Sequence, residues 1–295
     1  MAHAPLDLAK LKVYPLATRN SLSRIEEILV PPDDTPPACD EANERLISQC
    51  AWNISSARKR SAAVILMYGA HLLRNGAALI LEKMMARGWV THLATNGAGT
   101  IHDWEYSFLG RSTESVEENV AAGTFGTWDE TGRNIHLALL AGALAFKHVI
   151  PLTVHPGIGY DIIANHPMFN GAAIGRAADL DFRQFAGTVE ELDGGVVLAV
   201  GSAIMAPQVF EKSLSCVNNL RLQAGREIVC GHSIYVVDLQ DGGNWDWRQG
   251  EPPKTNPAYY LRFCKSFSRM GGEMNYLQCD NLNFVHHLLH ELARI

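Results

Sequence analysis

Residues that could do chemistry gather directly after a short apolar run at positions 90–94. A threonine, an asparagine and two glycines come first, and His102 and Asp103 follow within the next turn. Glycines let a ligand approach the backbone without a Cβ clash, and the first N–H groups of a following helix face an anion. We therefore expect this segment to contact a cofactor through Thr95, Asn96, Gly97 and Gly99.

His102 and Asp103 are candidate catalytic residues at the same turn. His102 suits acid–base catalysis because the ordinary pKa of histidine is near neutrality. A histidine in the first turn of a helix is also common as a hydrogen-bonded structural residue. The spacing is not the G-x-G-x-x-G fingerprint either, and many turns with two glycines only connect a strand to a helix.

Three later apolar runs end in similar turns. They are the runs 148–154, 195–203 and 233–239, and the polar or glycine residues at their ends are His155, Asp161, Gly201, Ser202, Asp241 and Gly242. Uniformly apolar strands, bounded by glycines and separated by helices, predict a parallel sheet covered on both faces. Because ligands bind at the carboxyl ends of such strands, we expect these turns to converge on one crevice.

The elements that would position these turns belong to an α/β fold with a doubly wound, mostly parallel sheet and helices on both faces. Periodicity predicts a strand at 63–67, a helix at 77–86 and a strand at 90–94, with helices from there to Phe146. We expect residues 46–295 to form a single domain. Residues 1–45 are punctuated by prolines and predict an extended arm with a short helix at about 20–29, suited to oligomer contacts.

Composition excludes several classes of partner. The chain has 295 residues, 47% of them hydrophobic, and can bury a large core. A net charge of −6 leaves no basic face for a phosphate backbone, so we expect no nucleic-acid partner. No apolar run approaches the roughly 18 residues of a membrane span, and we expect a cytoplasmic protein with no membrane partner. The six cysteines lack C-x-x-C spacing and are expected to be reduced thiols.

Segments along roughly residues 60–270 resemble, in order, those of the deoxyhypusine synthase family. The segment 95–103 is similar to that family's Thr-x-Ala-Gly-Gly-x-Glu-Glu-Asp, with Thr95, Gly99 and Asp103 matching. The loop that holds Asp161 resembles its Asp-Gly-Ser-x-Gly-Asp loop.

Residues 256–265 resemble the family segment that carries an imine-forming lysine. Lys265 falls on that lysine and Phe263 on an aromatic residue beside it. A lysine must be neutral to attack, and an aromatic neighbour can supply the dry wall that favours the neutral form.

The resemblance implies a Rossmann-like, NAD-binding domain and a transferase that acts on a small-molecule amine or polyamine. An aminobutyl group would pass through an imine on Lys265 to an acceptor amine. A homo-oligomer, a tetramer by analogy, would complete the active site across a subunit interface. The residues implied to hold the cofactor, beside those of the 95–99 turn, are Gly201, Ser202, Asp241 and Gly242. Those implied to hold substrate are Asp161, His155, Trp245, Asp246 and Phe263.

Departures from the family point to an altered substrate. Ile101 and His102 stand where the family has two glutamates, and its paired histidines after the third glycine turn are absent. An alternative function is that of a dinucleotide-binding sensor or scaffold without imine chemistry. Removing Lys265 would abolish turnover in the first case and leave binding intact in the second.

Two of these choices keep a structural interpretation beside the functional one. Lys265 lies among apolar residues, where a lysine often packs its stem on the surface. Trp245 and Trp247 flank Asp246 and could stack on a nicotinamide, an adenine or a cation, or else close the core at a loop.

The C-terminal segment holds His286 and His290, four residues apart. On one helix face this pair could bind a metal and support hydrolysis, yet the glutamate of a H-E-x-x-H helix is missing. We favour an amphipathic terminal helix without a metal, docked through its leucines.

Overall fold

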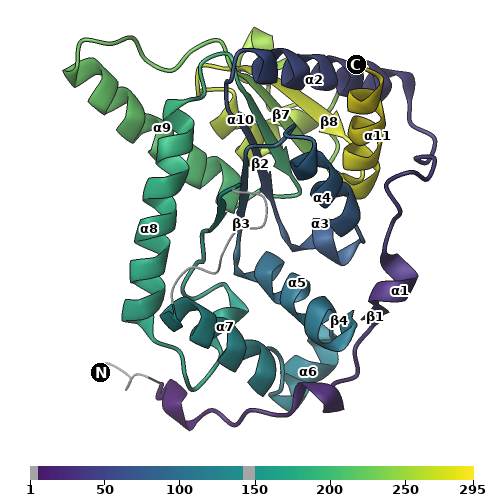
Figure 1. Ribbon diagram of the computed structural model, residues 1–295, viewed down its shortest axis with the longest axis vertical. Coiled ribbons are helices and arrows are strands. Elements are labelled where there is room, and N and C mark those ends of the chain that lie inside the picture. Colours follow the sequence, from purple (N-terminus) through teal and green to yellow (C-terminus); the bar gives the residue numbers. More distant parts are fainter. Residues whose placement is uncertain (1–5, 142–149) are drawn as a thin grey trace.

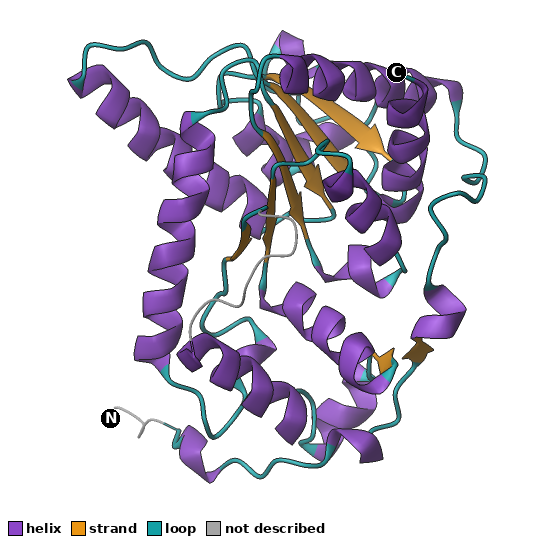
Figure 2. Ribbon diagram, in the orientation of Figure 1, coloured by secondary structure: helices purple, strands orange, loops and turns teal. Residues whose placement is uncertain are grey.

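Six parallel strands form the centre of the fold in this computed structural model, which describes residues 6–141 and 150–295 (Figures 1 and 2). Their order across the sheet is β5-β3-β2-β6-β7-β8. The strands are β2 (Val64–Tyr68), β3 (His92–Thr95), β5 (Leu152–Val154), β6 (Val196–Val200), β7 (Ser233–Asp238) and β8 (Glu273–Gln278).

Burial on both faces explains why the central strands are so apolar. Every residue of β2 and β6 is buried, and the two strands pair in parallel from Val64 opposite Val196 to Tyr68 opposite Val200. β-Branched and aromatic side chains suit such a doubly covered position. The carboxyl ends of these two strands determine where the turns that follow them begin.

Helices cover both faces of the sheet (Figure 2). One face packs against α2 (Glu41–Lys59), α3 (Ala70–Arg74), α4 (Ala78–Ala86) and α11 (Asn281–Arg294). The other packs against α8 (Gly171–Glu190), α9 (Met205–Gln223) and α10 (Arg262–Phe267). The predicted doubly wound, mostly parallel sheet is therefore confirmed.

Numbered in chain order, the strands run 3-2-1-4-5-6 across the sheet. This is the strand order of the Rossmann fold. The first three strands are added towards one edge of the sheet and the next three towards the other, so the order reverses between the first and fourth strands. Here that switch point lies between β2 and β6. Ligands of open α/β sheets bind outside the carboxyl ends of the strands at such a point.

The predicted strands of the sheet agree with the observed ones to within a few residues, except at one edge. The helix predicted at about 20–29 is shorter, because residues 23–24 form a strand and only residues 25–28 are helical. β8 was missed because its sequence, Glu-Met-Asn-Tyr-Leu-Gln, mixes polar and apolar residues. It is an edge strand, with both end residues exposed, so it lacks the uniformly apolar signal of the central strands. Parts of two predictions, the helix towards Phe146 and the start of the 148–154 strand, lie outside the described residues.

A second layer lies below the carboxyl edge of the sheet in Figure 1. It contains α5 (Gly97–Leu109), α6 (Val116–Ala122), α7 (Asp129–Ala141) and the two-stranded sheet of β1 (Ser23–Arg24) and β4 (Arg111–Ser112). Short helical turns complete the fold: α1 (Ile25–Ile28), η1 (Leu8–Lys10), η2 (Leu16–Thr18), η3 (Ile162–Ala164), η4 (Trp247–Gln249) and η5 (Pro257–Tyr260).

The N-terminal segment runs along this lower layer before it reaches α2 (Figure 1). Tyr14 forms a bridge with Trp128, Leu16 is fully buried, and β1 pairs with β4. The segment that the prolines mark as extended thus contacts its own chain. No helix of the described residues is long and apolar enough to cross a membrane.

Candidate active site

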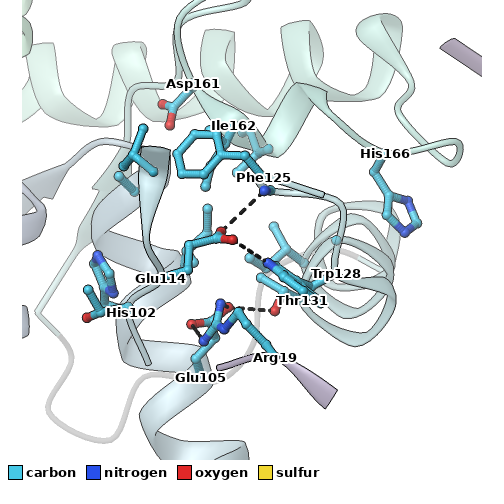
Figure 3. A pocket seen from close by; sticks show the side chains of 18 of the residues that line it. Arg19, His102, Glu105, Glu114, Phe125, Trp128, Thr131, Asp161, Ile162 and His166 are labelled. Atoms are coloured by element: carbon cyan, nitrogen blue, oxygen red, sulfur yellow. Dashed lines mark hydrogen bonds and ion pairs between the residues drawn. The ribbon is translucent and has the colours of Figure 1, made fainter. Parts of the chain in front are cut away.

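A cavity of about 240 Å³ lies in the lower layer, beside α5, and Figure 3 shows the side chains that line it. Its walls come from α5, α7, the loop around Glu114 and the segment that follows β5. Apolar side chains, among them Ile101, Phe125 and Trp128, alternate with charged ones. A small polar molecule with an apolar part matches this lining.

The first turn of α5 is held by oxygens of the chain itself. Asn96 caps the helix, and its side-chain oxygen accepts a hydrogen bond of 3.0 Å from the N–H of Gly99. The N–H of Gly97 donates to Oδ2 of Asp161 at 2.9 Å. A Cβ on Gly97 would lie 2.7 Å from that carboxylate. The two amides that we expected to face a cofactor are therefore occupied by groups of the protein.

Thr95 and Gly99 are packed together beneath the same turn. Thr95 is fully buried, and its hydroxyl donates to the carbonyl oxygen of Tyr68 at 3.0 Å. A Cβ on Gly99 would lie 2.2 Å from that hydroxyl. The glycine is needed for close packing of α5 on β3.

Asp161 reaches both α5 and the cavity (Figure 3). Burial raises the pKa of its carboxyl group, and the amides of Gly97, Gly157 and Ala98 act in the opposite direction. The predicted substrate residue thus lines the cavity, with its carboxylate fixed at a helix N-terminus where the dipole favours an anion.

His102 also lines the cavity, from the next turn of α5. Its Nδ1 lies 2.8 Å from the hydroxyl of Ser112, and its ring is stacked on Tyr106. Burial lowers the pKa of His102 to about 4, assisted by the positive charge of Arg74 and opposed by Glu105. The imidazole is therefore neutral at pH 7.

Glu105 lies three residues further along α5, on the same helix face as His102. It is 1% exposed, and its two oxygens accept hydrogen bonds of 2.8 and 2.7 Å from Arg19. Thr131 donates to Oε1 at 2.7 Å and Ser112 to Oε2 at 2.5 Å. A buried carboxylate with these partners has its charge fully compensated.

Glu114 also lines the cavity (Figure 3). Its carboxylate accepts hydrogen bonds from Trp128 Nε1 at 2.8 Å, from the Asn119 side chain at 2.6 Å and from the N–H of Gly126 at 3.2 Å. These bonds hold the loop that carries Phe125 over the cavity.

Among the described residues, Arg74 and Asp103 are charged groups without such partners. Arg74 ends α3, is exposed, and lines the cavity. Within residues 6–141 and 150–295 its guanidinium has no ion pair. Asp103 is exposed on α5, near Tyr68 at the end of β2, and its charge adds to the burial that raises the Tyr68 pKa.

Two glycines meet at the switch point of the sheet. A Cβ on Gly69, which follows β2, would lie 2.4 Å from the carbonyl oxygen of Gly201, which follows β6. Gly201 itself has a φ of +59°, which side chains rarely adopt. Ser202 comes next, and its hydroxyl accepts a bond of 3.2 Å from the N–H of Ala206 in α9. The backbones that follow β2 and β6 are thus in close contact at the switch point.

His155 belongs to a buried cluster rather than to the cavity. Its Nε2 lies 3.0 Å from the Thr153 hydroxyl, which also lies 2.9 Å from Nε2 of His92. Both rings meet Phe185 edge to face, and burial lowers the pKa of each histidine to about 4. These contacts are those of a packed core.

The predicted site residues from the C-terminal third lie around β7, β8 and α10. Lys265 Nζ donates to Glu251 at 2.8 Å and sits 3.3 Å from the ring centre of Tyr259. Phe263 is buried against Tyr276. None of these residues lines the cavity of the lower layer.

The loop after β7 is held by its own contacts. Asp241 accepts a bond of 2.8 Å from the N–H of Gly243, and a Cβ on Gly242 would lie 2.5 Å from Tyr276. Asp246 pairs with Arg248, and Trp245 Nε1 donates to the carbonyl oxygen of Gly250 at 2.9 Å. The structure therefore separates these predicted residues from His102 and Asp161.

Sequence patterns missed charged residues of the cavity wall, among them Arg19, Arg74 and Glu105. They also missed Ser112, which contacts His102. The His-x-x-Glu spacing at 102–105 was a usable signal, because it puts both side chains on one helix face. Arg19 gave no local signal, since it meets Glu105 only through the fold.

The C-terminal histidines lie on α11, whose leucines Leu288, Leu289 and Leu292 are buried as the amphipathic interpretation expects. His286 and His290 meet each other edge to face. Within the described residues no group of three or more histidine, cysteine, aspartate or glutamate side chains is arranged to hold a metal ion.

No protein-family profile and no curated protein matches the chain, but solved structures share its fold. ArgZ, an arginine dihydrolase from the ornithine–ammonia cycle in cyanobacteria, is 18% identical, with a TM-score of 0.50 over 85% of this chain. AgrE in a ternary complex with ornithine and NAD+ is 16% identical, with a TM-score of 0.52 over 88%. A conserved putative LOR/SDH protein from Methanococcus maripaludis S2 has the same identity, TM-score and coverage of this chain.

The match spans 33% of ArgZ and 34% of AgrE, about a third of each, and 74% of the LOR/SDH protein. At these identities the likeness shows the fold. It also corrects the resemblance to deoxyhypusine synthases, which was wrong: the neighbours are arginine- and ornithine-related proteins and a LOR/SDH protein. Aminobutyl transfer is contradicted with it, and Lys265, engaged by Glu251 and Tyr259, lies outside the cavity. The chain is a Rossmann-like α/β protein similar in fold to ArgZ, AgrE and the LOR/SDH protein.

Proposed function

We propose that this chain is an NAD-dependent oxidoreductase that acts on a small amino acid. The observation that carries the proposal is the glycine pair at the switch point, joined by α3 to a cavity with charged walls. α3 begins after Gly69 and ends at Arg74. A dinucleotide in the crevice and a substrate in the cavity would therefore be neighbours.

The switch point between β2 and β6 is where a fold with this strand order places the pyrophosphate of a dinucleotide. Gly69 and Gly201 keep the backbone here free of side chains, and a Cβ on Gly69 would lie 2.4 Å from the carbonyl oxygen of Gly201. The residues that would hold NAD are Gly69, Gly201, Ser202 and the exposed Ile204 at the start of α9. NAD, when bound, accepts a hydride from the carbon that carries the amine. AgrE binds NAD+ together with ornithine, which agrees with this cofactor.

The cavity suits a zwitterion. Arg74 offers a guanidinium for a carboxylate, and Asp161 offers a carboxylate for an ammonium group. Apolar walls such as Ile101 and Phe125 would contact the aliphatic part of the ligand. Ornithine, a ligand of AgrE, is the first amino acid to test.

We further propose that residues 46–295 act as one catalytic domain and that the preceding segment completes its cavity. Arg19 supports this, because it lines the cavity from the segment before α2.

A charge placed at the crevice tests the cofactor site. Ile204→Glu should repel the pyrophosphate and raise the Kd for NAD+ at least tenfold, measured by calorimetry. Leu220→Glu is the matched control, because Leu220 lies on the same helix and is 62% exposed against 61% for Ile204. Equal affinities of the two variants, or no NAD+ binding by the wild type, would contradict the proposal.

A second variant tests the amino-acid site. Arg74→Gln should raise the KM for ornithine at least tenfold, because the carboxylate loses its cation, while the Kd for NAD+ changes less than twofold. NADH absorbance during turnover gives the KM. An unchanged KM for every amino acid that the wild type oxidises would remove Arg74 from the site.

A further inference from the structure

We infer that His102 accepts the substrate's proton and that Ser112, Glu105 and Arg19 are positioning residues which keep its Nε2 unprotonated and available. This inference rests on the proposed function and assigns roles within the same cavity. It is carried by a continuous chain of hydrogen bonds from the N-terminal segment to the cavity wall.

The direction of each hydrogen bond follows from the chemistry of its partners. Arg19 can only donate, and its two bonds to Glu105 mark that side chain as an ionised carboxylate, which can only accept. The hydroxyl of Ser112, 2.5 Å from Glu105, must therefore donate to it. Ser112 has one hydroxyl hydrogen, so towards His102 it can only accept.

The proton of His102 is thereby placed on Nδ1. Nδ1 lies 2.8 Å from Ser112 and must donate to it. A neutral imidazole carries one N–H, so Nε2 keeps a lone pair. Nε2 has no hydrogen-bond partner within the described part of the chain, and the ring lines the cavity. Figure 3 shows His102 at the cavity edge, beside the Glu105 and Arg19 pair.

Burial is the main cause of the low pKa of His102, and charged groups on three elements modify it. Glu105 on α5 raises its pKa, whereas Arg74 and His71 on α3 and Arg19 of the N-terminal segment lower it. A substrate carboxylate on Arg74 would offset that cation. His102 then gains proton affinity at the moment when a substrate is bound.

The proton step balances with the proposed oxidation. One N–H bond of the substrate amine would break and its proton would move to Nε2. The C–H bond at the carbon that carries the amine would also break, and its hydrogen would leave with both electrons as a hydride, for which NAD+ would be the acceptor. The substrate becomes an imine. The imidazolium formed is stabilised through Nδ1, Ser112 and the negative charge of Glu105.

Kinetic variants test the roles. His102→Gln should lower kcat for ornithine at least 100-fold and change the Kd for NAD+ less than twofold. Ser112→Ala should lower kcat about tenfold, and Ser112→Thr, which keeps the hydroxyl, should restore most of it. The control is His287→Gln. His287 lies on α11, and its Nε2 is 2.6 Å from the carbonyl oxygen of Pro37.

The ring protonation can be read without turnover. In protein labelled with ¹⁵N-histidine, NMR should show one Nδ1–H imidazole whose signals vanish in His102→Gln and move towards the Nε2–H pattern in Ser112→Ala. A wild-type His102 in the Nε2–H form, or kcat of His102→Gln within twofold of wild type, would overturn the inference.

The two proposals fail in different ways. Absence of NAD+ binding by the wild type would overturn the proposed function, and the role of His102 with it. Intact NAD+ binding and oxidation, with His102→Gln fully active, would overturn only the inference.

Discussion

Arg19 and Glu105, separated by 86 positions, form a two-pronged ion pair with N···O distances of 2.8 and 2.7 Å. Both side chains are almost completely buried, at 3% and 1% exposed. The guanidinium also lies 5.7 Å from the ring centre of Trp128. The pair fastens the N-terminal segment to the helix that carries His102.

We expect Arg19→Met to lower the free energy of unfolding by about 3–5 kcal/mol, because the Glu105 charge is left buried without its partner. Adding Glu105→Gln should recover part of the loss, since the uncompensated charge is then removed. Urea unfolding measures both. Arg248→Met breaks the exposed pair with Asp246 and should have no measurable effect. A loss below about 1 kcal/mol for Arg19→Met would mean that the pair is not buried in solution.

The switch-point glycines give a second prediction. Gly69→Ala should destabilise the protein by about 1–3 kcal/mol and weaken NAD+ binding, because the new Cβ would meet backbone at 2.4 Å. Gly175→Ala in α8 is the control: nothing lies within 4 Å of its Cβ, and it should stabilise the helix by roughly 0.5–1 kcal/mol. Thermal unfolding with and without NAD+ checks both. A harmless Gly69→Ala would show that the backbones of Gly69 and Gly201 approach less closely than the structure indicates.

Stability should fall in mild acid because of the buried histidines. Burial and the nearby His155 lower the pKa of His92 from 6.5 to about 4. Between these values the unfolded chain binds a proton that the folded chain does not. The contribution of His92 to the free energy of unfolding is therefore fully present above pH 6.5 and is lost as the pH falls towards 4. At about 1.4 kcal/mol per pKa unit, His92 accounts for about 3 kcal/mol of the loss.

His92→Gln should therefore flatten the dependence of unfolding free energy on pH between 6.5 and 4, although it is less stable at pH 7. Denaturant unfolding at several pH values measures the slope. The control is His287→Gln, a histidine near the surface. A slope equal to that of the wild type would show that His92 is not held neutral.

The acid limb of the pH profile should report His102. Its pKa of about 4 places the fall of kcat/KM near pH 4 rather than near pH 6.5. Arg74→Gln removes a cation that lowers this pKa, so the limb should move to higher pH. Arg87→Gln, at an exposed position after α4, should leave it in place. A limb that moves to lower pH in Arg74→Gln would contradict the assignment.

Lys265 should be dispensable for oxidation. Lys265→Met loses the contacts with Glu251 and Tyr259, and we expect kcat for ornithine to stay within twofold of the wild type. Borohydride added during turnover should leave no substrate adduct on Lys265 by peptide mass mapping. An adduct there would restore imine chemistry to this chain.

Local patterns found most of the sheet because burial on two faces demands continuous apolar runs. β2, β6 and β7 were predicted within three residues at either end for that reason. The edge strand β8 escaped because half of it faces solvent, and its mixed residues resemble a loop. Asp161 and His102 were found at strand ends, where parallel sheets gather polar groups.

Lys265 and Arg19 show where local reasoning stopped. A lysine among aromatic residues has the same local sequence whether it attacks a substrate or pairs with Glu251, and only its position in space distinguishes the two. Arg19 stands among prolines in an apparent arm, yet it lies against Glu105.

The sequence by itself determined the alternation of strands and helices, the glycines at their junctions and thus the parallel, doubly wound sheet, because these depend on residue periodicity and backbone sterics between neighbours. Tertiary structure decided that Asp161 accepts a hydrogen bond from the first turn of α5 and that the backbone of Gly69 packs on that of Gly201. It also decided that Arg19, through Glu105, completes the chain of hydrogen bonds to His102. Contacts between residues tens of positions apart depend on how the elements pack, and no local pattern contains that information.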